Sequence, residues 1–196
     1  PLTEAIHKYD CRCFVQLHHY GAKSAPTAAG KAWAASEVPV APGGPSAHKM
    51  TVEEIKIVEQ RFVDAAVRAQ KAGFDGVQLA GSHGYLLHQF LSPYYNDRTD
   101  EYGGSAENRA RFAVEAVSAV HAAVPGMPID YKLAVRQKEP HYGNAGVVEE
   151  ELPIFVPLLE RAGVTSFHVT LANHSALENT IPPANHPYFG HPGCFL

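Results

Sequence analysis

The sequence predicts an α/β fold and, within that class, the central part of a (β/α)8 TIM barrel. Predicted strands and helices alternate along the 196 residues, which implies a parallel sheet with helical crossovers. The segments after strands are long, whereas the helix-to-strand turns at residues 72–74, 125–128 and 162–164 are short. That asymmetry is typical of a barrel with its chemistry at one face. About four β/α units are visible, so residues 1–196 are expected to form one partial barrel domain whose flanking strands lie outside this chain.

The first half of the chain gives one strand and one well-marked helix. Residues 12–19 read as a strand, and residues 20–50 form a loop rich in Gly, Ala, Pro and Ser. A helix begins at Thr51, where Thr51 and Glu54 have the spacing of a capping box. Apolar residues then recur at helical spacing, and Gly73 is expected to end the helix because glycine adopts positive φ without strain.

The second half continues the alternation. The predicted elements are a strand at residues 74–80, a helix at 105–123, a strand at 129–135, a helix at 149–162 and a strand at 164–170. Pro153 fits the first turn of its helix, but Pro157 removes an interior hydrogen bond, so a kink or a late start is expected there. No G-x-G-x-x-G follows a strand, which disfavours the competing doubly wound dinucleotide fold.

Composition excludes several classes. The net charge of −4 and the lack of a Lys/Arg run predict no nucleic-acid partner. No apolar run is long enough to cross a bilayer and no leader is visible, so we expect a cytoplasmic protein without a membrane partner. Three cysteines make no disulfide framework, and Cys11 and Cys13 are expected to be reduced thiols. The 12 histidines show no metal-ligand spacing, so no metal site is predicted, and a metal-dependent barrel hydrolase is disfavoured.

The segment at residues 73–112 is the most informative part of the chain. It runs from a buried strand into a long polar loop and then into a helix. Connections of this length are uncommon in compact domains unless they build a site. Polar side chains, most of them titratable, crowd the loop: Ser82, His83, Tyr85, His88, Asn96, Asp97, Arg98, Asp100, Glu101 and Tyr102. Their position after the carboxyl end of a strand predicts an active site of the barrel type.

Several motifs, in order, resemble those of the Old Yellow Enzyme family of FMN-dependent ene-reductases. They are Q-L-H-H-x-G from Gln16 to Gly21, P-S-A at residues 45–47, A-G-F-D-G-V-Q-L at 72–79, H-G-Y-L-L-H-Q-F-L-S-P at 83–93 and N-D-R-T-D-E-Y-G-G-S-x-E-N-R at 96–109. The resemblance covers most of the chain and is most specific from Gly73 to Arg111. It implies a (β/α)8 barrel with FMN across the carboxyl ends of its strands.

The resemblance assigns two residues to the cofactor. Gln16 matches the glutamine that hydrogen-bonds the flavin pyrimidine ring, where an amide can both donate and accept. Its alternative is an interior polar residue of the barrel. Lys132 falls where most members carry an arginine facing flavin N1, and lysine keeps that charge but loses the planar fork. The alternative is that Lys132 is a solvated lysine at the end of a strand with no role in cofactor binding. Arg136 is the second candidate for the cation that faces flavin N1.

The resemblance also assigns the substrate side. Tyr85 matches the tyrosine that gives a proton to substrate carbon. Most members grip the substrate carbonyl with a His-x-x-His or His-x-x-Asn pair, but here those positions hold Ala80 and His83, which leaves His83 as the substrate contact. An apolar first position is similar to the 2,4-dienoyl-CoA reductase and enoate reductase branch. In that branch a histidine after a later strand supports the tyrosine, and His174 stands in the matching place. Arg98, Asp100 and Arg109 are expected to tie the loop down through ion pairs.

The resemblance therefore implies a flavoprotein oxidoreductase. NADH or NADPH would reduce FMN, and the flavin would pass hydride from N5 to the activated C=C bond of an unsaturated carbonyl or thioester substrate, with Tyr85 and His174 as catalytic residues. Any iron–sulfur cluster would lie outside this chain, and a homo-oligomer stays open. The alternative is a truncated, non-catalytic fragment of such a barrel that binds no flavin.

Overall fold

The computed structural model describes residues 2–24, 30–39, 46–135, 147 and 149–170. His174 and Arg136 lie outside these residues. The elements in chain order are α1 (Leu2–His7), β1 (Phe14–Leu17), the 3-10 turn η1 (Gly21–Lys23), β2 (Trp33–Ala34), β3 (His48–Lys49), α2 (Val52–Lys71), β4 (Gly76–Gly81), α3 (Leu86–Leu91), α4 (Ala106–Ala123), β5 (Ile129–Ala134), η2 (Glu149–Glu151), α5 (Leu152–Ala162) and β6 (Ser166–Thr170).

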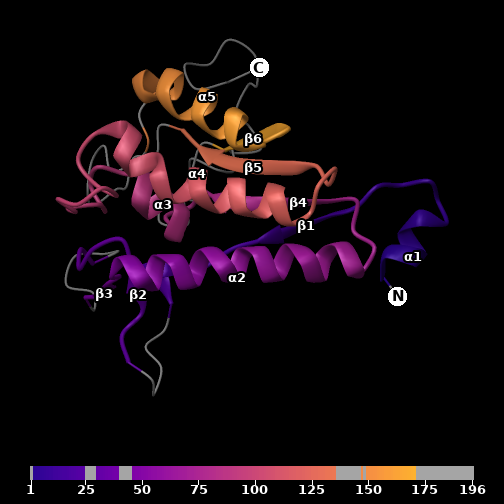
Figure 1. The fold of residues 1–196 in the computed structure, drawn as a ribbon, viewed down its shortest axis with the longest axis horizontal. Coiled ribbons are helices and arrows are strands. Elements are labelled where there is room, and N and C mark those ends of the chain that lie inside the picture. The colour runs from indigo at the N-terminus through magenta and orange to yellow at the C-terminus, as the bar shows by residue number, and fades with distance from the viewer. Residues whose placement is uncertain (1, 25–29, 40–45, 136–146, 148, 171–196) are drawn as a thin grey trace, which may run out of the picture.

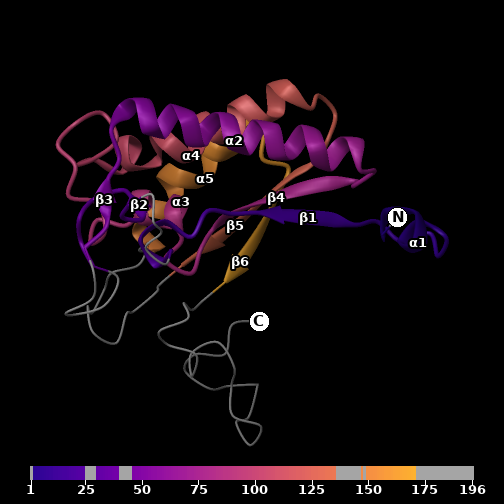
Figure 2. The ribbon, with the colours of Figure 1, turned by 90° about the horizontal axis from the view of Figure 1, so that it is seen from below.

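The main sheet has four parallel strands in the spatial order β1-β4-β5-β6. Helices α2, α4 and α5 lie together on one face of this sheet, and no helix of the described residues covers the other face (Figures 1 and 2). Strands inside and helices outside are the arrangement of consecutive units of a parallel barrel. The predicted α/β class, with a parallel sheet and helical crossovers, is confirmed.

Helix α2 forms as the sequence predicts. Thr51 Oγ1 accepts a hydrogen bond from the Glu54 backbone N–H at 3.2 Å, and Glu54 Oε2 accepts one from the Thr51 N–H at 2.8 Å. These two bonds satisfy donors that the first helical turn leaves free. The buried stripe comprises Ile55, Val58, Phe62, Ala66 and Ala69. The chain leaves the helix through Gly73 at φ 82°, a conformation that side chains with a Cβ adopt only at a cost.

The core lies between the sheet and its helices. Strands β4 and β5 contribute Val77, Leu79, Ile129, Tyr131 and Leu133, all at most 1% exposed. Helix α4 contributes Ala110, Phe112, Ala113, Ala116, Val117 and Val120. Burial of each large apolar side chain contributes about 1.5–3 kcal/mol, so this layer fixes which face of each strand meets the helices. The remaining strand positions therefore point to the helix-free face.

Close packing requires a glycine at the carboxyl end of β4. A Cβ on Gly81 would meet the ring of Tyr131 at 2.3 Å, closer than any real contact. Tyr131 is fully buried, and the carboxyl ends of β4 and β5 are thereby held against each other. Substitution of Gly81 would therefore require the buried Tyr131 ring to shift, at the end of the sheet where the candidate site lies.

Three short elements lie where the sequence predicted loops. Helix α1 precedes the first strand, although the sequence predicted no helix before it. This helix is held in place by the Thr3 hydroxyl, which donates a hydrogen bond to Ala72 O at 2.7 Å. Strands β2 and β3 form a two-residue parallel pair within the predicted loop at residues 20–50. Helix α3 lies within the long loop after β4, and all six of its residues are buried. Helices of six residues do not form from local preference alone, so tertiary contacts hold them.

The last α-helix begins three residues later than predicted, at Leu152, but this start does not place Pro157 in its first turn. The 3-10 turn η2 precedes it, the α-helix begins at Leu152, and Pro153 occupies its first turn. Pro157 lies inside α5, and Gly163 ends the helix with φ 122°. The described part of the chain contains no helix with both the length and the apolarity that a bilayer crossing requires.

Candidate functional site

Polar side chains line the helix-free face of the sheet. Gln16 Nε2 donates to Gln78 Oε1, and Gln78 Nε2 donates to Asp130 Oδ2. Ser166 Oγ donates to Asp130 Oδ1 at 2.6 Å, and His168 Nδ1 lies 3.3 Å from Gln78 Nε2. These contacts join all four strands across one face, so they form a continuous hydrogen-bonded layer. We call this set of five residues the polar layer.

The strand register places the predicted cofactor residues on this face. Gln16 pairs with Gln78, and Gln78 pairs with Asp130. Lys132 lies two residues beyond Asp130 and therefore points to the same side of the pleated sheet. Its ammonium makes no hydrogen bond or ion pair within the described residues, unlike the other polar side chains here. The face therefore carries an amide at β1 and a cation at β5, with β4 between them.

Tyr85 lies beyond the carboxyl end of β4, directly before helix α3. It is 7% exposed, and its ring contacts those of His18 at 5.3 Å, Tyr20 at 5.2 Å and His83 at 6.1 Å between centroids. The Lys23 ammonium lies 5.7 Å from the centre of the Tyr85 ring. The loops after β1 and β4 thus meet in one aromatic cluster, which comprises His18, Tyr20, His83 and Tyr85.

Burial decides the protonation of this cluster. Desolvation, assisted by Tyr20, raises the pKa of Tyr85, so its phenol keeps its proton at neutral pH. The neighbouring His88 is fully buried, and burial followed by the nearby Lys23 and His83 lowers its pKa to about 3. Its neutral Nδ1 accepts the Gly84 backbone N–H at 2.8 Å. The loop therefore contains a neutral phenol and a neutral, buried imidazole.

His83 has an unusual backbone. Its φ of 56° lies in the left-handed region, which costs roughly 1 kcal/mol or more for a residue with a Cβ. The Lys23 ammonium donates to His83 O at 2.5 Å and holds this conformation. Strain of this kind is common where a side chain must be aimed at a ligand. The turn places the His83 ring beside that of Tyr85.

The ion pairs expected in the loop are present. Arg98 binds Asp100, with a 2.6 Å contact from Nη2 to Oδ2, and its Nη1 donates to the carbonyls of Ala35 and Met50. Arg109 binds Glu151 and donates to Leu91 O. Both guanidinium groups are buried in structural roles. They fasten the loop and do not face the aromatic cluster.

One cavity adjoins the start of the helix-free face, at β1. This cavity of about 260 Å³ between β1 and α2 contains Gln16 but neither Lys132 nor Tyr85. Its walls are Gln16, Leu17, His18, His19, Val58, Arg61, Phe62 and Ala65. The sheet face and the aromatic cluster adjoin it at the carboxyl end of β1. His174, the predicted partner of Tyr85, lies outside the described residues.

Sequence reasoning missed several members of this constellation. Gln78, Asp130, Ser166 and His168 were not singled out, although each alternates with apolar residues that face the helices. That alternation was the available signal. His18 was quoted only within a motif and Tyr20 fell at its unspecified position, because nothing in the sequence showed that two loops meet.

Comparison with known proteins decides the family. Residues 1–160 match the NADH:flavin oxidoreductase / NADH oxidase family. The chain belongs to this family. Its predicted barrel class and its resemblance to Old Yellow Enzyme are both confirmed, because the family is built on a (β/α)8 barrel and the four parallel strands supply part of one.

Relatives of this family member include several reductases. Bilirubin reductase of Clostridium symbiosum (strain WAL-14163) is 55% identical over 153 residues, 78% of this chain and 40% of its own length. NADH oxidase of Thermoanaerobacter brockii is 38% identical over 185 residues, 93% of this chain and 28% of its own. A structure of 2-naphthoyl-CoA reductase with 2-naphthoyl-CoA has a TM-score of 0.77 at 27% identity, covering 89% of this chain and 28% of that one. The chain thus spans well under half the length of these relatives.

Proposed function

We propose that this chain supplies part of the flavin and substrate sites of an FMN-dependent NAD(P)H oxidoreductase that reduces activated C=C bonds. The observation that carries the proposal is the arrangement around β4. Gln16 and Lys132 lie on one helix-free face on either side of this strand, and the neutral phenol of Tyr85 lies beyond its carboxyl end. Family membership supports the same reading.

The chemistry of the donor set fits the pyrimidine end of FMN. The Gln16 amide can donate to a ring carbonyl and accept from the ring N–H. Lys132 offers a cation that has no partner in the described part of the chain, and such a charge stabilises an electron-rich flavin. Bound FMN would supply the hydride that it receives from NADH or NADPH. Gln78 and the rest of the polar layer would hold the Gln16 amide in its plane.

On the substrate side, Tyr85 would deliver the proton. Its raised pKa keeps the phenol protonated until a neighbouring carbon becomes basic enough to accept the proton. His83 would contact the substrate oxygen, because Ala80 offers no hydrogen bond and is only 2% exposed. His174, assigned by resemblance, would hold the phenol from the far side. A one-point contact favours a thioester or a large conjugated carbonyl over a small enone.

Names of relatives suggest which substrates to try. Relatives include a bilirubin reductase and a cinnamate reductase of Clostridium sporogenes that is 34% identical over 197 residues. The similar structure is a 2-naphthoyl-CoA reductase. Bilirubin, cinnamate and an unsaturated acyl-CoA are therefore the candidate substrates, in that order of sequence identity.

Titration with FMN tests the proposal. The purified chain should quench FMN fluorescence with saturation. Gln16→Leu and Lys132→Met should each weaken that binding about tenfold, since a hydrogen bond to a charged group is worth about 1.5–3 kcal/mol. Lys71→Met is the matched control, because Lys71 is exposed at the end of α2 and should leave binding unchanged.

A second outcome would favour the non-catalytic alternative. If the folded chain leaves FMN fluorescence unchanged, the chain by itself is a structural piece of a barrel. If Lys71→Met weakens binding as much as Lys132→Met does, binding is non-specific and the assignment of Lys132 is wrong.

A further inference from the structure

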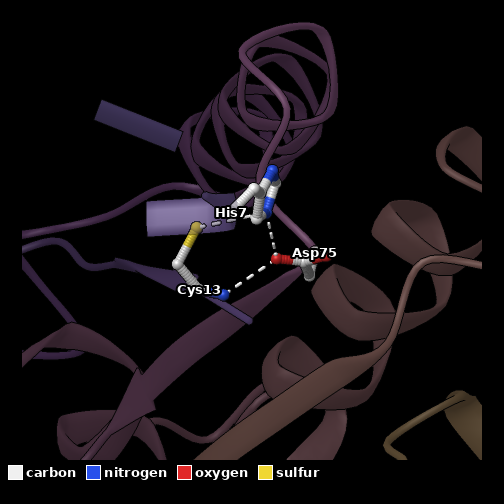
Figure 3. Close-up of side chains that lie close together, drawn as sticks. All are labelled: His7, Cys13 and Asp75. Carbon is white, nitrogen blue, oxygen red and sulfur yellow. Dashed lines mark hydrogen bonds and ion pairs between the residues drawn. The ribbon is translucent and has the colours of Figure 1, made fainter. Parts of the chain in front are cut away.

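A second cluster of polar side chains lies at the opposite end of the sheet. His7 ends helix α1, Cys13 directly precedes β1, and Asp75 directly precedes β4. His7 Nε2 lies 2.8 Å from Asp75 Oδ2 and 3.9 Å from Cys13 Sγ. One ligand atom from each residue lies within 4.8 Å of the other two. Figure 3 shows the three side chains pointing toward one another from three separate segments.

This cluster is independent of the candidate flavin site. Helix α1 lies at one end of the sheet, whereas α3 and the β2–β3 pair lie at the other end (Figure 1). His7, Cys13 and Asp75 make no contact with the polar layer or the aromatic cluster in the described structure. The proposed reductase chemistry therefore gives these three residues no role.

We propose that His7, Cys13 and Asp75 bind one divalent transition-metal ion of the Zn²⁺ type, with water as the fourth ligand. Imidazole, thiolate and carboxylate are the three protein ligand types that Zn²⁺ takes in tetrahedral sites. A thiolate disfavours Mg²⁺ and Ca²⁺, which prefer oxygen ligands. Spacing along the sequence hid this set, because Asp75 is far from the other two in the chain.

The two ligand-atom separations that involve His7 require only a small adjustment. Tetrahedral bonds of about 2.0–2.3 Å place ligand atoms roughly 3.5 Å apart. The separation of 3.9 Å between His7 Nε2 and Cys13 Sγ is already close to that value. The 2.8 Å contact from His7 Nε2 to Asp75 Oδ2 would open by roughly 0.5 Å as a metal replaces the shared proton.

Surrounding contacts orient the carboxylate. The Cys13 backbone N–H donates to Asp75 Oδ2 at 2.8 Å, and Arg12 Nη1 donates to Oδ1 at 2.9 Å. Such outer contacts fix a ligating group in metal sites. Because Arg12 occupies Oδ1, the carboxylate would bind through one oxygen. The His7 side chain is 38% exposed, so an ion can enter from solvent.

Titration with Co²⁺ tests the proposal, because Co²⁺ takes Zn²⁺ geometry and reports a thiolate ligand by a charge-transfer band in the near ultraviolet. The full chain, freed of metal with a chelator, should develop this band to saturation at one Co²⁺ per chain. Zn²⁺ should abolish the band by competition, and Mg²⁺ should not. His7→Gln should weaken Co²⁺ binding by at least about tenfold, since even outer contacts are worth that much.

Cysteine variants identify the ligand. Cys13→Ser should lose the band, whereas Cys11→Ser, two residues away and exposed, should keep it. Because the chain has three cysteines, the double variant Cys11→Ser/Cys194→Ser retains only Cys13 and should still show the band. That variant keeps the test decisive even if Cys13→Ser fails to fold. Absence of a band in the unaltered chain, its loss in the double variant, or its survival in Cys13→Ser would each overturn the proposal.

Discussion

The position and the protonation state of Tyr85 depend on the residues around it. Its ring packs against His18, Tyr20 and His83, and burial keeps its hydroxyl protonated. The motif H-G-Y supplied the residue, but the contacts with His18 and Tyr20 come from another loop. Because the ring is held on several sides, removal of the hydroxyl should remove the acidic proton without moving the ring.

Replacing Tyr85 with Phe should separate the two half-reactions in a flavin-loaded protein. Phenylalanine keeps the ring packing and removes the proton. Reduction of the flavin by NAD(P)H should stay within about twofold, whereas reoxidation by an unsaturated substrate should slow by about 10²–10⁴, the usual value of general acid catalysis. Stopped-flow absorbance of the flavin measures both steps.

The control for this variant is Tyr20→Phe, which changes a phenol in the same cluster. It should leave both half-reactions near their original rates. An equal loss of both half-reactions in Tyr85→Phe would show that the residue packs and does not donate.

His88 gives the loop a stability that depends on pH. Its folded pKa of about 3 lies below the ordinary value of 6.5, so the unfolded chain binds the proton more readily. Stability from this group is therefore fully present above about pH 6.5 and is lost as the pH falls toward 3. The main cause of the lowered pKa is burial of the imidazole, with smaller contributions from Lys23 and His83.

Replacement of His88 by Asn should flatten this dependence. Asparagine can still accept the Gly84 N–H but does not titrate. Between about pH 7.5 and pH 5, the free energy of unfolding should fall by about 2 kcal/mol more in the unaltered chain than in the variant. Urea denaturation at several pH values measures the difference. Parallel pH profiles for the two proteins would show that His88 does not control this loss.

At the scale of elements, one arginine joins segments that are distant in the chain. The Arg98 side chain is 2% exposed and connects the loop after α3 to the segments around β2 and β3 through Ala35 O and Met50 O. It also holds Asp100 with a forked contact. The loop is long but anchored, so the site beside it has a rigid support.

Arg98→Lys should destabilise the chain although it keeps the charge. A single ammonium cannot replace the planar fork, so at least one buried carbonyl loses its donor, at a cost of about 2–4 kcal/mol. The matched control is Arg111→Lys at an exposed position of α4, where the change should be within about 0.5 kcal/mol. Urea midpoints of the two variants measure this contrast, and similar midpoints would contradict the anchoring role of Arg98.

Long elements were predictable because their signals are local. Helices α2 and α4 have caps at Thr51 and Ser105, and the strands around them alternate with helical patterns. Helices α1 and α3 were missed because six residues carry too little local preference. Only burial of α3 and the bond of Thr3 to Ala72 O explain why they form.

At the scale of the molecule, the sheet has two central and two outer strands. β4 and β5 each have a partner on both sides, whereas β1 and β6 each have one within the described residues. The central strands also carry the most buried side chains. The backbone amides of the two central strands should therefore be better protected from exchange with solvent than those of the two outer strands.

Hydrogen exchange should therefore distinguish the strands. Backbone amides in β4 and β5 should exchange most slowly, and those in β1 and β6 at least about tenfold faster, since local opening is easiest at the edges. Measurement at two protein concentrations separates this effect from pairing between copies. Equal protection in all four strands at both concentrations would show that the outer strands have further partners within the chain.

The sequence by itself determined the barrel class and the capped helices, and its motifs indicated the family to which the chain belongs. These follow from periodicity, capping and motifs, which are local properties of the chain. Only the tertiary structure decided that Gln16, Gln78, Asp130 and Ser166 form one layer, that two loops meet around Tyr85, and that His7 and Cys13 meet Asp75. The physical reason is that parallel strands bring residues distant in the chain into register, and side-chain spacing along the sequence carries no record of that register.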